Sequence, residues 1–331
     1  MTAREARIAH FVTTRPMAAI LAAIGFVLLS VSYVSGSYPP PSGFDRGLVF
    51  DSPSEWFASS ASESFGFNFA GLVVLATLMM VLNSSFNILR SFSVTFVGLF
   101  IIMTAATPAS ACAFTGATLL AVTVLSAMTI MLTVYGRPSL SRRVFMAFFL
   151  VALGGLTQYA FIPYLLVLTG GIFQMRVGSG KTLLAGALGV ITPLWLVWAF
   201  WPTTTLEPPV HMPDFTYYML DWPFHARLVT WVTAGTTLVL GVMLGVSNMV
   251  RIYSYNAKAR AINGLLTVVG IMTVILTLAD YTNMPVYIVL LNVCTAFQAG
   301  HFCAIHERQR SYLVMVGLAL LYTGFWIWNI I

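Results

Sequence analysis

The chain has 331 residues, of which 59% are apolar and only 8% are charged, and its formal net charge is +6. Soluble domains are typically about 45–50% apolar and about 25% charged, so the composition excludes an ordinary soluble protein and indicates an integral membrane protein. The basic residues are dispersed among short connections instead of gathered on one face, which argues against a nucleic-acid partner.

Apolar runs predict the fold class, an all-α polytopic integral membrane helical bundle that forms a single domain over residues 1–331. The first run follows a basic head and is expected to be an uncleaved signal anchor. About eleven transmembrane helices are predicted from the sequence, at Met17–Val34, Phe67–Leu82, Val94–Thr107, Ala113–Val134, Val144–Tyr159, Ile162–Phe173, Leu183–Trp201, Leu228–Val246, Leu265–Leu278, Val286–Ala299 and Tyr312–Ile330.

The charges predict the orientation of these helices. With the N-terminus in the cytoplasm and the connections alternating, all of the 16 Lys and Arg residues except Arg46 and Arg227 lie inside, as the positive-inside rule requires. The C-terminus is then outside. Most acidic residues fall on the outside, and we take this clustering as an indication that the outer face carries the chemistry.

A short broken hairpin is predicted in the middle of the chain. Two apolar runs share roughly thirty residues between Val144 and Phe173, whereas one untilted span needs about 20. The longer stretch from Ser141 to Trp201, which adds a third apolar run, is interrupted by Gly154-Gly155, Pro163, Gly170-Gly171 and Pro193. Irregular backbone at membrane depth is tolerated only where protein or a water-filled cavity surrounds it. We therefore expect a cavity near Gln158, Tyr159 and Tyr164; the alternative is that the break only packs against neighbouring helices.

Two outer connections are long. In the first, residues 35–66, Ser52 and Glu55 match a capping box with Pro53 at the first helical position, which predicts a short helix. Aromatic residues would let this helix lie on the membrane surface, namely Trp56, Phe57 and Phe65. The second connection, residues 202–226, is rich in proline and aromatic residues and is expected to form an ordered lid.

The outer connections also hold the candidate site residues. Asp45 or Asp51 is the candidate catalytic base, since a lipid-phosphate sugar donor needs a carboxylate near the acceptor and cations near the phosphate. The planar guanidinium groups of Arg46 and Arg227 suit that phosphate. The second connection would complete a substrate-binding site through His211, Asp214, Asp221 and His225. The alternative is that the carboxylates are solvated charges or helix caps and that the arginines pair locally with Asp45 and Asp221.

No resident metal site or other cofactor is predicted, although the sequence leaves open whether a divalent metal takes part. The run HFCAIHE contains metal-ligand residue types, but only Cys303, His306 and Glu307 have spacings that place them on one side of a helix. We interpret this run as the inner end of a helix. The three cysteines indicate no disulfide framework.

Two stretches resemble a known family: GGLTQYAFIPYLLVLTGGIFQMRVGSGKTLLAGALGVITPLWLVWAFW and AGHFCAIHERQRSYLVMVGLALLYTGFWIW. They are similar to an uncharacterised multi-pass membrane protein family of the Bacteroidota, over about the last two thirds of the chain. The resemblance implies the bacterial inner membrane and no established activity. The matching residues are Met175, Arg176, Ala185, Gly186, Pro193 and Trp195, then His301 and Phe302.

The layout more distantly resembles the C-type, lipid-donor glycosyltransferases and the O-antigen polymerases. These have an inside N-terminus, a long acidic first outer loop with a surface helix, a broken mid-chain hairpin and a late outer loop. The resemblance implies that the catalytic carboxylate maps to Asp45 or Asp51. This chain lacks the adjacent acidic pair and the large outer domain found in many of them, so the likeness is an analogy of layout.

Three functions follow as hypotheses. The first is an enzyme of lipid-linked or cell-envelope glycan assembly that acts at the periplasmic face on a polyprenyl-phosphate-linked sugar. The second is a transporter or flippase, suggested by the broken hairpin, although the spans lack the buried ionisable residue that ion coupling usually uses. The third is a non-catalytic subunit of an envelope assembly complex.

Overall fold

The computed structural model describes residue 11 and residues 14–35, 49–57, 59–89, 94–200, 224–252, 255–305 and 312–331. Within these ranges the chain is all-helical and has no strand, which confirms the all-α part of the predicted fold class. Three short 3-10 helices, η1 (Pro138–Leu140), η2 (Tyr159–Phe161) and η3 (Tyr281–Asn283), lie between longer ones. The α-helices are α2 (Arg15–Ser35), α3 (Ala61–Phe86), α4 (Thr95–Ala105), α5 (Pro108–Ala111), α6 (Gly116–Leu132), α7 (Ser141–Thr157), α8 (Pro163–Gln174), α9 (Gly180–Phe200), α10 (Phe224–Ile252), α11 (Ala257–Ala279), α12 (Met284–Ile305) and α13 (Tyr312–Ile330).

Every predicted span overlaps one of these helices. Among the described residues, eight helices are long and apolar enough to cross a membrane, which supports a multi-pass membrane protein. The three shorter apolar helices are Thr95–Ala105, Gly116–Leu132 and Tyr159–Gln174. The count of about eleven crossings therefore stays a prediction.

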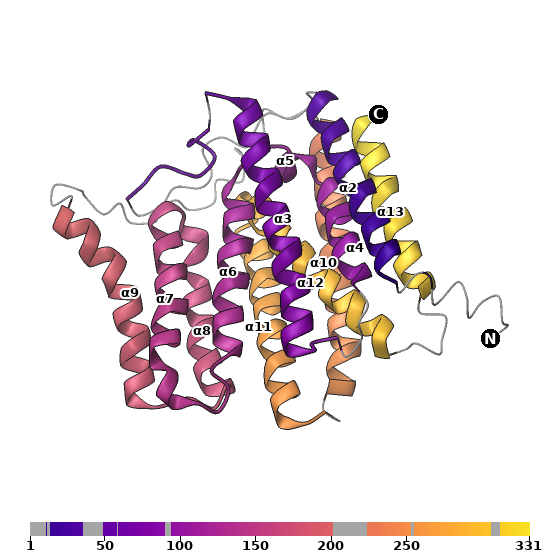
Figure 1. Ribbon diagram of the computed structural model, residues 1–331. Coiled ribbons are helices and arrows are strands. Elements are labelled where there is room, and N and C mark those ends of the chain that lie inside the picture. The colour runs from indigo at the N-terminus through magenta and orange to yellow at the C-terminus, as the bar shows by residue number, and fades with distance from the viewer. Residues whose placement is uncertain are drawn as a thin grey trace.

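The helices stand side by side (Figure 1), and the helix ends that adjoin the predicted outer connections lie at the upper end of the bundle. We call this the predicted outer end; it holds the last residue of α2, the last of α7 and the first of α10. Among the described charged residues, the acidic ones lie here: Asp51, Glu55, Glu63 and Asp280. Apart from Arg227, the described basic residues lie at the opposite, predicted inner end: Arg15, Arg137, Arg142, Arg143, Arg176, Lys181, Arg251, Lys258 and Arg260.

Helix α12 forms the core of the bundle. It packs against α10, α6, α11 and α4, and 78% of its most apolar stretch is buried. Helix α9 lies at the edge, packed mainly on α7 (Figure 1), and only 22% of its corresponding stretch is buried. A helix that is apolar all round can therefore be either the core or the lipid-facing edge, and only the packing tells them apart.

Helix α4 is short because protein surrounds it. Its 11 residues are all buried and rise only about 16 Å, well under the hydrocarbon thickness of about 30 Å. It packs against α2, α12 and α13, and a turn after Ala105 leads into the four-residue helix α5. Such an interruption is tolerated at membrane depth where neighbouring helices cover it.

The structure corrects which residues interrupt the mid-chain hairpin. Helices α7, α8 and α9 run through Gly154-Gly155, Gly170-Gly171 and Pro193 without ending. The chain leaves the helix at Gln158, whose backbone is extended, with φ −162° and ψ 130°. Pro163 then occupies the first turn of α8, where its missing N–H costs no helical hydrogen bond. The prediction that the two glycine pairs and Pro193 break the helices is wrong.

Candidate functional site at the predicted outer end

Asp51 is held beside the break between α7 and α8. The last carbonyl groups of a helix lack intrahelical partners, and the Leu156 carbonyl in the last turn of α7 accepts from two backbone N–H groups. Val49 and Phe50 donate these bonds, at 3.1 and 3.0 Å. The indole N–H of Trp56 donates to the backbone carbonyl of Asp51 at 3.1 Å. These bonds position the Asp51 backbone next to the break, while the residue itself is exposed.

An aromatic cluster, Trp56, Phe57, Phe67 and Phe114, fixes the rest of this segment. Phe57 stacks on Phe67 of α3 with ring centroids 4.3 Å apart and meets the edge of Phe114 at 5.5 Å. The Trp56 ring lies 6.2 Å from Phe114 and is 47% exposed. A partly exposed indole beside an exposed carboxylate is a suitable surface for a polar ligand with an apolar face, because its ring is apolar and its edge is polar.

The expected surface helix after Ser52 is absent from the described part of this connection. Residues 53–57 form turns, and the Ser52 hydroxyl accepts from the Ser54 N–H instead of capping a helix. The helix begins later, at Ala61, where the side chain of Ser60 accepts from the Glu63 N–H at 3.4 Å. Phe65, the third expected surface aromatic, belongs to α3.

Polar side chains of α3 hold the connection between α5 and α6 below the aromatic cluster. The Ser64 hydroxyl accepts from the Phe114 N–H at 2.8 Å. Asn68 is fully buried; its amide donates to the Ala111 carbonyl and its amide oxygen accepts from the Thr118 hydroxyl. Hydrogen-bonding through both ends of one amide satisfies a polar group that would otherwise be costly at this depth.

Side chains fill the break between α7 and α8. The Gln158 side chain lies against Gly116, where an added Cβ would be 1.9 Å from its Oε1 atom. Phe161 lies against Gly154 in the same way, 2.2 Å from an added Cβ. Both side chains are buried, with exposures of 1% and 0%. The break is therefore packed against α6 and α7. This is the alternative to a cavity that the sequence analysis left open.

The two predicted tyrosines have different environments. Tyr159 is half-buried in η2, close to the segment that carries Asp51. Tyr164 is buried, and its hydroxyl shares a hydrogen bond of 2.9 Å with the Thr273 hydroxyl on α11. Tyr164 thus ties α8 to α11, whereas Tyr159 remains accessible at the outer end.

His225 and Arg227 lie in the first turn of α10. The exposed His225 meets the Trp328 ring edge to face, with centroids 5.9 Å apart. Arg227 is half-buried, and its buried Nε atom has no hydrogen-bond partner within the described ranges. A guanidinium N–H in that state favours an anionic partner, because desolvation of a charged donor is costly without one.

Near the start of α12, Asp280 belongs to a hydrogen-bonded cluster with Asn283 and Tyr287 that the sequence analysis did not identify. Asp280 accepts hydrogen bonds from the Asn283 amide, at 3.0 Å to each carboxylate oxygen, and from the Tyr287 hydroxyl at 2.8 Å. The neighbouring Tyr281 ring lies 6.4 Å from Trp231, which is one turn after Arg227 on α10. The sequence signal was the spacing of Asp280, Asn283 and Tyr287 around a helix start.

The predicted residues fall into two places. Asp51 and Tyr159 lie by α7, which packs against α9, α6 and α8; Arg227 and His225 begin α10, which packs against α12, α11 and α13. Both places are at the same end of the bundle (Figure 1). The predicted roles of Asp45, Arg46, His211, Asp214 and Asp221 concern residues outside the described ranges.

No metal centre is found in the described part of the chain, where no three His, Cys, Asp or Glu residues are grouped to hold an ion. His301 is buried near the inner end of α12 and lies 6.0 Å, centroid to centroid, from the Tyr255 ring. His306 and Glu307 lie outside the described residues.

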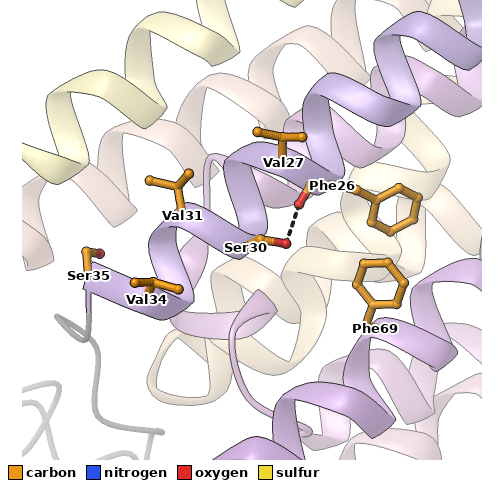
Figure 2. A pocket seen from close by; sticks show the side chains of 7 residues that line it. All are labelled: Phe26, Val27, Ser30, Val31, Val34, Ser35 and Phe69. Atoms are coloured by element: carbon orange, nitrogen blue, oxygen red, sulfur yellow. Dashed lines mark hydrogen bonds between the residues drawn. The ribbon is translucent and has the colours of Figure 1, made fainter.

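An apolar groove opens between α2 and α3 near the predicted outer end (Figure 2). The two helices meet through ring pairs, Phe26 with Phe69 at 4.6 Å and Tyr33 with Phe65 at 4.3 Å. The groove has a volume of about 550 Å³ and is lined by Phe26, Val27, Ser30, Val31, Val34, Ser35 and Phe69. The Ser30 hydroxyl donates to the Phe26 carbonyl, so the lining offers mainly hydrocarbon, and the groove suits a lipid chain.

The chain matches no protein-family model, no curated protein and no solved structure.

Proposed function

We propose that this protein is a multi-pass inner-membrane enzyme of cell-envelope glycan assembly that transfers sugar from a lipid-phosphate donor at the predicted outer end. The observation that carries the proposal is the pair of hydrogen bonds from Val49 and Phe50 to Leu156, which holds the Asp51 backbone by the last turn of α7, just before the half-buried Tyr159 in the sequence. Assignment to the bacterial inner membrane rests on the resemblance stated above and on the apolar helices.

In the proposed reaction Asp51 is the general base. Its carboxylate takes the proton from a hydroxyl group of the acceptor sugar, and the acceptor oxygen forms a bond to the anomeric carbon of the donor. The bond between that carbon and the lipid phosphate breaks, and the phosphate leaves with the electron pair. A positioned base contributes roughly 10²–10⁴-fold to such a rate. Asp45 is the alternative base.

The phosphate and the lipid need their own contacts. The unpartnered Nε of Arg227 supports a role for this side chain in holding a phosphate, and Arg46 is its predicted companion. The groove between α2 and α3 supports a lipid donor, because it offers an apolar path at the end of the bundle where Asp51 lies. Trp56 offers an exposed ring for the sugar.

Asp51→Asn tests the proposal, with Glu55→Gln as the matched control. Both are exposed acidic residues of one short segment, and both substitutions keep the shape of the side chain while removing its charge. In cells whose only copy is Asp51→Asn, we expect envelope glycans, analysed by mass spectrometry, to fall at least about 100-fold at normal expression. Glu55→Gln should leave them unchanged. Unaltered glycans in Asp51→Asn and in Asp45→Asn cells would refute the catalytic assignment.

A second candidate is a non-catalytic subunit of an envelope assembly complex. The packing of Gln158 and Phe161 against glycines favours it, because the hairpin break is filled by the protein's own side chains. This candidate predicts stable co-purification with a partner and tolerance of every outer carboxylate substitution. Movement of a lipid-linked sugar across vesicles without a covalent product would instead favour a transporter or flippase.

A further inference from the structure

A second groove lies between α10 and α11, with α12 as its floor, in the half of the bundle nearer the predicted inner end. It has a volume of about 220 Å³. Three glycines lie among its mostly aliphatic lining residues, Gly241 and Gly245 one turn apart on α10 and Gly270 on α11. An added Cβ at Gly245 would meet only the Gln298 Cδ atom, at 3.9 Å, so the space there is open.

One side-chain amide lines this groove, whose Thr267 and Thr295 hydroxyls already donate to backbone carbonyls. Gln298 lines it and is only 9% exposed. Its amide oxygen accepts from the Asn248 Nδ2 atom at 2.8 Å, and none of its hydrogen bonds with described residues uses the amide nitrogen. A donor that faces an apolar groove without a partner of its own is best satisfied by an acceptor, so this nitrogen indicates a ligand with a carbonyl or other acceptor oxygen.

A cation continues the same wall toward the predicted inner end. Arg260 is exposed and precedes the groove residue Thr267 by two helical turns, so both lie on the same side of α11. Seven residues correspond to about 10 Å along the helix. Lys258, also exposed, is two residues away and lies on another side of α11. The groove therefore leads from hydrocarbon, past an amide donor, to a guanidinium.

This order of groups matches a glycerophospholipid, which has an acyl chain, an ester carbonyl and then a phosphate. We propose that the groove binds one acyl chain of an anionic glycerophospholipid, with Gln298 donating to the ester carbonyl and Arg260 contacting the headgroup. This site is independent of the proposed function at the outer end.

The test uses the full-length protein in detergent, with dioleoyl phosphatidylglycerol and dioleoyl phosphatidylcholine as probes and native mass spectrometry to count bound lipid. We expect the wild type to retain one phosphatidylglycerol and less phosphatidylcholine. Arg260→Gln should weaken phosphatidylglycerol binding about fivefold, the effect of one basic residue near anionic lipid. Lys258→Gln is the matched control and should change it little.

A second pair of variants tests the groove itself. Gly245→Leu fills the space and should lower the binding of both lipids at least about tenfold, since close-packed interiors leave no second path for the chain. Gly235→Leu is its control, because Gly235 is also on α10 and an added Cβ there meets nothing within 4 Å. Should Gly245→Leu fail to fold, lipid binding by Arg260→Gln, a substitution of an exposed residue, still tests the proposal.

Three results would overturn the proposal. The first is equal binding of phosphatidylglycerol by the wild type, Gly245→Leu and Arg260→Gln. The second is equal retention of the two lipids by the wild type. The third is a wild-type dimer that Gly245→Leu dissociates without any change in bound lipid, which would assign the groove to a second copy of the chain.

Discussion

Gly154→Ala should destabilise the protein although alanine is the better helix former. The new Cβ would lie 2.2 Å from the Phe161 ring, and overpacking of this kind costs about 1–3 kcal/mol. The higher helix propensity of alanine than of glycine offsets about 1 kcal/mol of this cost at most. Because the ring is buried between helices and the contact is severe, we expect a net loss of about 2 kcal/mol in the free energy of unfolding.

The neighbouring glycine supplies the control. A Cβ at Gly155 would meet the Ile162 Cγ1 atom at 3.4 Å, an ordinary contact, so Gly155→Ala should be neutral or slightly stabilising. Unfolding in mixed micelles, followed by circular dichroism, measures both variants. Adding Phe161→Ala to Gly154→Ala should cost less than the sum of the two single changes, because each relieves the other. Equal stability of the Gly154→Ala and Gly155→Ala proteins would refute the packing of the break described above.

Two further predictions concern the supports of the Asp51 segment. Asn68→Leu should lower the free energy of unfolding by about 1–3 kcal/mol in the same assay, because it leaves the buried Ala111 carbonyl without its donor. A decrease below about 0.5 kcal/mol, the level of a neutral surface change, would contradict this prediction. Ser60→Ala should cost about 1 kcal/mol through loss of the N-cap of α3, and Ser60→Asp, which keeps an acceptor, should restore most of it.

Long apolar runs made the helices predictable, but two kinds of information were not in the pattern. The first is where a glycine acts. Gly154 and Gly170 looked like helix breakers, yet α7 and α8 continue through them. A side chain at position 154 would collide with the Phe161 ring, and only the folded turn brings these two residues together. The second is the extent of burial, which apolar composition does not reveal. Helices α4 and α9 are both apolar, but α4 is fully buried and α9 lies at the edge of the bundle.

The start of α3 could have been found. Ser60 and Glu63 have the same spacing as Ser52 and Glu55, so the sequence contained two capping signatures, and only the second begins a helix. Proline at position 53 favoured the wrong one. The docking of Val49 and Phe50 on Leu156 had no sequence signal, because backbone groups of an irregular segment made these bonds. The site prediction therefore named Asp51 without the backbone bonds that hold its segment at the end of α7.

The position of α4 has a consequence for how the protein is made. This helix is too short to be a stable membrane span by itself, and its cover includes α13, the last helix of the chain. Helix α13 also reaches α2, where the Trp326 indole donates to the Ser32 hydroxyl at 2.8 Å. Helices α2 and α13 thus close over a segment made early in synthesis. A ribosome that stops before Tyr312 would leave the side of α4 that faces α13 uncovered, a product suited to degradation by membrane quality control.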